Sequence, residues 1–236
     1  MQRISLNRSI ILPLALLVWI VVFLCFMLFK QNESFYQINM NIVIATSFYA
    51  GVVVMMYVIR NHSMGFAFYS ALGLLCLQLS NLYDLLFGLV SKVPPYLTVS
   101  DFSTVCTYLF FISALIELKT HNTNKFKMPF LVINIFAAFA VVAVGYAVII
   151  NNVAMMPMAY FSLDLICIII SCTMIMDKTA RLFSSMVLLI TLCDAIMQIT
   201  DPETFVSLLA FALLPICYVL LAHSITHYKA GEPHVG

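Results

Sequence analysis

Three aspartates lie inside apolar stretches that are long enough to cross a membrane, and a fourth opens such a stretch. Asp84, Asp164 and Asp194 each lie about six residues from the outward end of their apolar stretch, roughly 9 Å along a helix. Asp101 is the first residue of another such stretch. An isolated carboxylate at that depth costs on the order of a few kcal/mol. We therefore expect all four side chains to face the interior of a helix bundle, at one depth in the outer half of the membrane.

Polar side chains accompany these acids at helical spacing. Gln198 follows Asp194 at i+4 and Tyr160 precedes Asp164 at i−4, so each pair shares one helix face. Several such faces at one depth can line a single pocket that opens away from the cytoplasm. The residues predicted to bind a ligand in that pocket are Asp84, Asp101, Asp164, Asp194, Asn81, Gln78, Gln198, Tyr160 and Tyr108.

No Lys or Arg lies within the apolar stretches to neutralise these acids. The carboxyl groups then have three options: protonation on burial, one proton shared between neighbours, or a guest that is cationic or donates hydrogen bonds. The alternative is structural, with each Asp serving as a hydrogen-bonded contact between helices. For one of the four, the pair Ser100-Asp101 also predicts a helix N-cap.

Other candidate chemistry is sparse. His223 and His227 have the i, i+4 spacing of metal ligands, but no further ligand accompanies them, so we predict no metal site. Pro215 is expected to free a carbonyl of its helix and to bend it. The sequence contains no hydrolase, metalloprotease or P-loop motif. We therefore predict a protein that is not an enzyme and that has no cofactor.

The composition excludes a soluble protein. Of the 236 residues, 64% are hydrophobic and 9% are charged, whereas soluble domains carry about 25% charged residues. The formal net charge of +1 provides no basic surface for nucleic acid. Seven Cys occur singly, without a CxxC pair, as expected for buried apolar side chains.

The predicted fold is all-α, a polytopic membrane bundle of eight transmembrane helices. A span needs about 20 apolar residues, and runs near that length cover about 9–29, 40–59, 64–90, 101–118, 130–150, 159–176, 184–200 and 205–225. With both termini in the cytoplasm, all Lys and Arg except Lys30 and Lys92 lie on the inner side. This bias predicts a plasma (inner) membrane protein with a cytoplasmic N-terminus.

Residues 1–236 are predicted to form a single transmembrane domain. An alternative division into two four-helix halves, about 1–120 and 121–236, rests on a repeated pattern. Asp84 and Asp194 each lie about two turns before an outer turn that contains proline, and an apolar helix follows each turn.

Four short segments carry these acids: Asn81-Leu-Tyr-Asp84-Leu-Leu, Pro95-Tyr-Leu-Thr-Val-Ser-Asp101-Phe, Ala159-Tyr-Phe-Ser-Leu-Asp164-Leu and Thr191-Leu-Cys-Asp194-Ala. Together with Tyr108-Leu-Phe-Phe they resemble the eight-helix membrane input regions of bacterial GGDEF-type diguanylate cyclases and histidine kinases. The resemblance covers about residues 64–225. This chain lacks the family's glycine before Asp84, and no catalytic domain follows Ile225. The resemblance implies an input module whose output resides on another protein.

Three functions are compatible with these features. The first is a non-enzymatic membrane sensor or receptor-like protein, which binds a small polar or cationic ligand and acts in signal transduction through a protein partner. The second is a small cation- or proton-coupled transporter that uses the same acids. The third is a structural or assembly subunit of a membrane complex. Membrane lipids are expected partners of all three, and nucleic acid of none.

Overall fold

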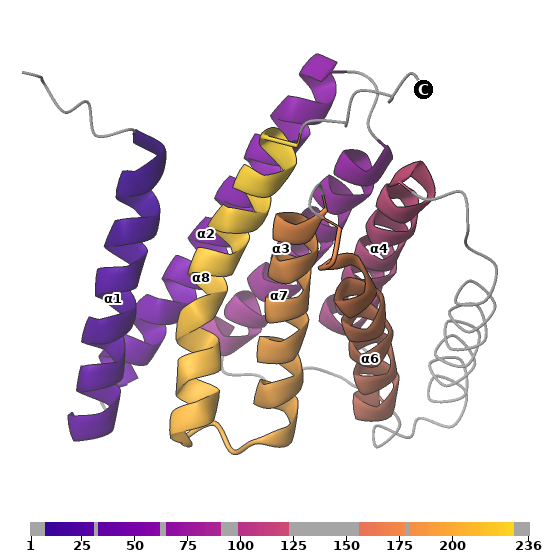
Figure 1. Cartoon of the computed structure of the whole chain (residues 1–236). Coiled ribbons are helices and arrows are strands. Elements are labelled where there is room, and N and C mark those ends of the chain that lie inside the picture. The colour runs from indigo at the N-terminus through magenta and orange to yellow at the C-terminus, as the bar shows by residue number, and fades with distance from the viewer. Residues whose placement is uncertain are drawn as a thin grey trace, which may run out of the picture.

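The computed structural model describes residues 8–30, 33–61, 65–90, 99–122, 156–177 and 180–228. Within these ranges helices are the only regular secondary structure, and short turns connect some of them (Figure 1). The helices are α1 (Arg8–Lys30), α2 (Glu33–Asn61), α3 (Gly65–Val90), α4 (Val99–Asn122), α6 (Met156–Met174), α7 (Arg181–Ile199) and α8 (Phe205–Thr226). The prediction of an all-α bundle is confirmed for this part of the chain.

Six of the described helices are long and apolar enough to cross a membrane: α1, α2, α3, α4, α7 and α8. Helix α6 contributes the shorter apolar run Tyr160–Met174. Helices suit such segments because a lipid environment offers the backbone no hydrogen-bonding partners outside the chain. The protein is therefore a multi-pass membrane protein. The expected span at about 130–150 lies outside the described residues, so the count of eight stays a prediction.

Two expected helix starts differ from the observed ones. Helix α2 begins at Glu33, well before the expected start at about residue 40, because a polar first turn does not interrupt a helix that extends past the hydrocarbon core. Helix α4 begins at Val99, so Ser100 and Asp101 already lie within its first turn. The interpretation of this pair as an N-cap is therefore wrong, and the Asp101 side chain is available for contacts with another helix.

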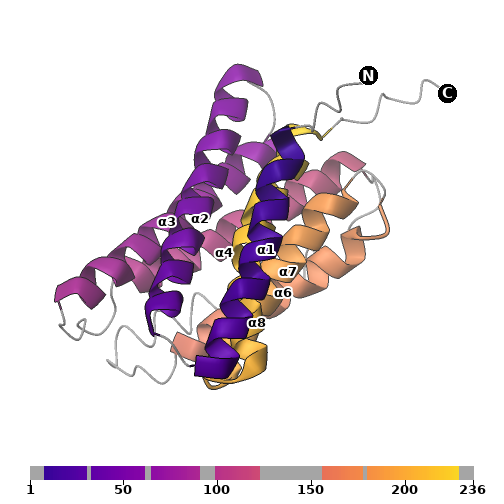
Figure 2. The same cartoon turned by 90° about the vertical axis from the view of Figure 1, so that its left-hand side faces the viewer.

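Six of the described helices contact one another in a closed cycle. Around it, α2 packs against α3, α3 against α4, α4 against α6, α6 against α7, α7 against α8, and α8 against α2. Helix α1 lies outside this cycle, mainly against α8, as both views of the ribbon show (Figures 1 and 2). On α1, Leu14, Leu17, Val18 and Val21 are more than half exposed. Such an outward apolar surface is suited to contact with lipid.

Close helix contacts depend on small residues. Gly73 on α3 faces the ring of Phe111 on α4, and a Cβ atom added there would lie 3.0 Å from that ring. Gly51 on α2 faces Leu74 on α3 at an ordinary packing distance of 3.6 Å. Without a water-driven hydrophobic effect, helices in lipid gain affinity from this close approach.

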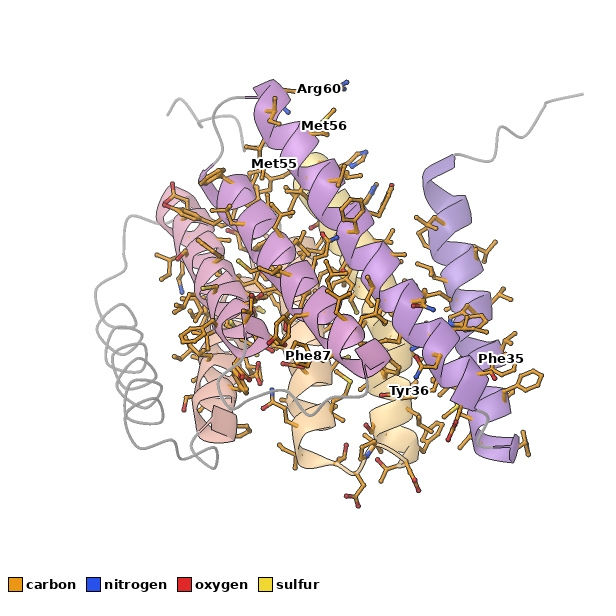
Figure 3. The ribbon with its side chains drawn as sticks, turned by 180° about the vertical axis from the view of Figure 1, so that it is seen from behind. Phe35, Tyr36, Met55, Met56, Arg60 and Phe87 are labelled. Carbon is orange, nitrogen blue, oxygen red and sulfur yellow. The ribbon has the colours of Figure 1, made fainter. Side chains whose placement is uncertain are left out.

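The two ends of the bundle differ in residue type. In the rear view, Arg60 stands at one end of α2, whereas Phe35 and Tyr36 stand at the other (Figure 3). Phe87, near the end of α3, lies toward the same end as Tyr36 (Figure 3). The end that carries Arg60 is the one predicted to face the cytoplasm.

Candidate functional site

Two carboxylates from neighbouring helices share one amide donor. Gln198 on α7 donates through Nε2 to Oδ2 of Asp194 at 3.1 Å and to Oδ2 of Asp164 on α6 at 3.3 Å. The first bond follows the i, i+4 spacing that the sequence predicts. The second crosses between helices and depends on the packing of α6 against α7. Asp164 is 0% exposed, whereas Gln198 lies at the exposed edge of the pair.

A third helix reaches the same pair through a phenol. The hydroxyl group of Tyr108 on α4 donates to Oδ2 of Asp194. Tyr108 is 4% exposed, and its hydroxyl also lies close enough to Asp164 to interact with it electrostatically. We refer to Tyr108, Asp164, Asp194 and Gln198 as the acidic cluster. It connects α4, α6 and α7 inside the bundle.

One carboxylate oxygen of the acidic cluster is not engaged in a hydrogen bond within the described residues. Oδ1 of Asp164 is buried and has no hydrogen-bond partner among the residues that the structure describes. Among the described residues, no Lys, Arg or His forms an ion pair with Asp164 or Asp194. A buried polar atom without a partner costs free energy, about 1–3 kcal/mol in proteins. The cluster therefore has the capacity to accept one more hydrogen bond or a positive charge.

A second tyrosine–carboxylate contact lies beside the acidic cluster. Tyr160 on α6 donates to Oδ1 of Asp101 on α4 at 2.6 Å. Tyr160 stands four residues before Asp164, so the two α4–α6 contacts occupy neighbouring turns of α6. Both Asp101 and Tyr160 are partly exposed.

The predicted residues of α3 are less closely connected to the acids. Asn81 has a buried Nδ2 with no hydrogen-bond partner among the described side chains and backbone, and Gln78 is half-buried on the same helix. Asp84 lies on α3, but its side chain is outside the described residues. The polar contact that does join α3 to α4 uses hydroxyl groups, with Ser80 Oγ 2.7 Å from Ser100 Oγ and 2.9 Å from Thr104 Oγ1.

Three cavities in the described part of the chain lie away from the acidic cluster. One of about 520 Å³ is lined by residues such as Glu33, Tyr36 and Glu203, and a neighbouring one of about 120 Å³ shares Tyr36. The third, of about 550 Å³, is lined by His223 and His227 among others. The described lining of these three cavities includes none of the four predicted aspartates. The common pocket for all nine predicted residues thus stays a prediction.

Sequence reasoning did not single out Asn39, which joins its own helix α2 to two others, α1 and α8. Its Oδ1 accepts a hydrogen bond from Trp19 Nε1 on α1 at 2.8 Å, and its Nδ2 donates to the carbonyl oxygen of Phe211 on α8 at 3.4 Å. Asn39 is 0% exposed. The available signal was Pro215, four residues after Phe211, because a freed carbonyl in lipid requires a donor from another helix.

The comparisons with known proteins provide no further identification. No family model, no curated protein and no solved structure matches the chain.

Proposed function

We propose that this multi-pass membrane protein is a receptor-like sensor whose acidic cluster responds to a cationic or hydrogen-bond-donating ligand, with a proton as the smallest case. The observation that carries the proposal is Oδ1 of Asp164, which is buried beside a second carboxylate and has no hydrogen-bond partner within the described part of the chain. Intramembrane acids of this kind are rare and commonly mark functional sites, because their burial is costly unless a partner neutralises them.

The donors within the cluster are too few for its acceptors. Two carboxylates offer four oxygens, and Gln198 and Tyr108 direct their hydrogen bonds to Oδ2 atoms. A ligand that donates to Asp164 Oδ1 would supply the missing hydrogen bond, and a positive charge would also offset the negative charge of the pair. This shortage supports a bound cation or proton over a purely structural contact.

The position of the cluster supports a signalling role. Its members come from α4, α6 and α7, so a change in occupancy alters contacts between three helices at once. A ligand shifts a conformational equilibrium when it binds one arrangement of the helices better than another. In this proposal the N-terminus faces the cytoplasm, the membrane is the plasma (inner) membrane, and the basic inner ends of the helices transmit the change to a protein partner.

Thermal unfolding of the purified full chain in detergent tests the proposal. The probes are protons, Na⁺, K⁺ and methylammonium, compared with a choline control of equal ionic strength. We expect at least one probe to raise the unfolding temperature of the wild type and to lose that effect in Asp164→Asn. The matched control Glu203→Gln removes an exposed carboxylate of the α7–α8 turn and should retain the shift.

Equal shifts in the wild type and in Asp164→Asn, or no shift with any probe, would overturn the proposal. Liposome assays separate the sensor from the transporter. Uptake of the active probe that disappears in Asp194→Asn would identify a carrier, whereas a shift without uptake supports the sensor. An assembly subunit would tolerate both substitutions and would still co-purify with its partner.

A further inference from the structure

The last turn of α8 brings two imidazole rings together, remote in sequence from the acidic cluster. The ring centroids of His223 and His227 lie 4.0 Å apart, and the ring planes are inclined by 34°. The i, i+4 spacing places both side chains on one face of the helix. Two imidazoles in this arrangement can direct one nitrogen each toward a common point.

The hydrogen bonds of His227 determine which nitrogen is available. Its Nδ1 lies 3.1 Å from the carbonyl oxygen of His223 and 3.1 Å from Oγ1 of Thr226. A carbonyl oxygen only accepts, so in the tautomer that donates from Nδ1 to the His223 carbonyl the lone pair lies on Nε2. Metal-binding histidines are commonly oriented in this way, with the second ring nitrogen donating to a carbonyl oxygen.

Both histidines line a cavity with room for an ion and its water ligands. The cavity has a volume of about 550 Å³ and lies between α1, α2 and α8, where Pro13, Tyr49 and Val53 form part of its wall. The lining residues that the structure describes include no carboxylate. An all-imidazole donor set favours Cu²⁺, Ni²⁺ or Zn²⁺ and disfavours Ca²⁺ and Mg²⁺, which require oxygen ligands.

We propose that His223 and His227 bind a divalent transition-metal ion through their two imidazoles. Within the described residues no group of three or more His, Cys, Asp or Glu side chains gathers around a potential metal position. The protein therefore supplies two ligands, and water occupies the remaining positions. Such a site is open and exchangeable, unlike the four-ligand sites that hold structural zinc. This proposal departs from the sequence-based prediction of no metal site, and it is independent of the acidic cluster.

The test uses Cu²⁺ with the full chain, purified without a histidine tag and stripped with chelator. Electron paramagnetic resonance of the Cu²⁺ complex should show nitrogen couplings from two imidazoles. His223→Ala and His227→Ala should each reduce this to one imidazole and should weaken Cu²⁺ binding by about tenfold or more. The matched control His121→Ala removes a histidine outside the pair and should leave both readouts unchanged.

Size-exclusion profiles and circular dichroism establish that each variant is folded before titration. If a single-alanine variant does not fold, His223→Gln or His227→Gln takes its place, since glutamine retains a long polar side chain without the imidazole. A two-imidazole spectrum that survives both substitutions at the pair would overturn the proposal. An equal loss of binding in His121→Ala would do so as well, since it would indicate scattered surface binding.

Discussion

The side-chain amide of Asn39 donates a hydrogen bond to the main-chain carbonyl oxygen of Phe211 across the contact between α2 and α8. Pro215, four residues after Phe211, has no N–H group, so this carbonyl has no i+4 donor in its own helix. Asn39 supplies the donor that the proline removes, and Trp19 in turn donates to Asn39. The proline and the asparagine are therefore expected to be energetically coupled.

That coupling can be measured with Asn39→Leu. This substitution retains side-chain volume but removes the partner of the buried Phe211 carbonyl and of the partly buried Trp19 N–H, so we expect a loss of about 1–3 kcal/mol in the free energy of unfolding. In a Pro215→Ala background the carbonyl regains a donor from its own helix. In that background Asn39→Leu should reduce the free energy of unfolding by less than in the wild type. Thermal or denaturant unfolding in detergent measures the difference. Equal costs in the two backgrounds would refute the coupling.

The acidic cluster depends on the Tyr108 hydroxyl. Tyr108→Phe retains the ring and removes the hydrogen bond to Asp194, so we expect a loss of about 1–3 kcal/mol in unfolding free energy. Tyr160→Phe, which removes the bond to Asp101, is the matched control because Tyr160 is partly exposed and water can replace its hydroxyl. Tyr160→Phe should reduce the free energy of unfolding by less than Tyr108→Phe. A larger loss for Tyr160→Phe would contradict the central role of the buried cluster.

The packing of α3 can be tested with two glycines. Gly73→Ala introduces a Cβ atom 3.0 Å from the Phe111 ring and 3.3 Å from the Thr107 carbonyl oxygen, and such overpacking costs about 1–3 kcal/mol. Gly51→Ala meets its nearest neighbour at 3.6 Å, so the gain in helix propensity, about 1 kcal/mol, should dominate. The two alanines should therefore shift the unfolding temperature in opposite directions. A rise for Gly73→Ala would show that α3 can move away from α4, and a fall for Gly51→Ala would contradict the ordinary packing distance at Gly51.

Membrane orientation can be tested at the two ends of α7. Glu203 lies in the turn that follows α7, and Asp177 lies shortly before the first residue of α7, Arg181. In a background without native cysteines, a membrane-impermeant maleimide should label Glu203→Cys in intact cells and Asp177→Cys only after permeabilisation. The reason is the predicted excess of Lys and Arg on the inner side. The reverse labelling pattern would place the N-terminus outside.

The sequence by itself determined the class of protein and the approximate positions of the described helices. Apolar runs near membrane-spanning length can be read directly, because lipid leaves the backbone no alternative to helix. The contact between Gln198 and Asp194 was also predictable, since both residues lie on one helix at i, i+4. Helix starts were less accurate, as Glu33 and Val99 show, because polar first turns resemble loops in sequence.

Only the tertiary structure decided which helices face one another. Periodicity indicates the inward face of a helix but not the residue opposite it, so the sequence did not distinguish Tyr108 from Tyr160 as the partner of Asp194. The same holds for Asn39, whose role arises from the packing of α2 beside a proline-containing turn of α8. Hydrogen bonds between helices depend on distances of a few ångströms, which the packing of the whole bundle sets.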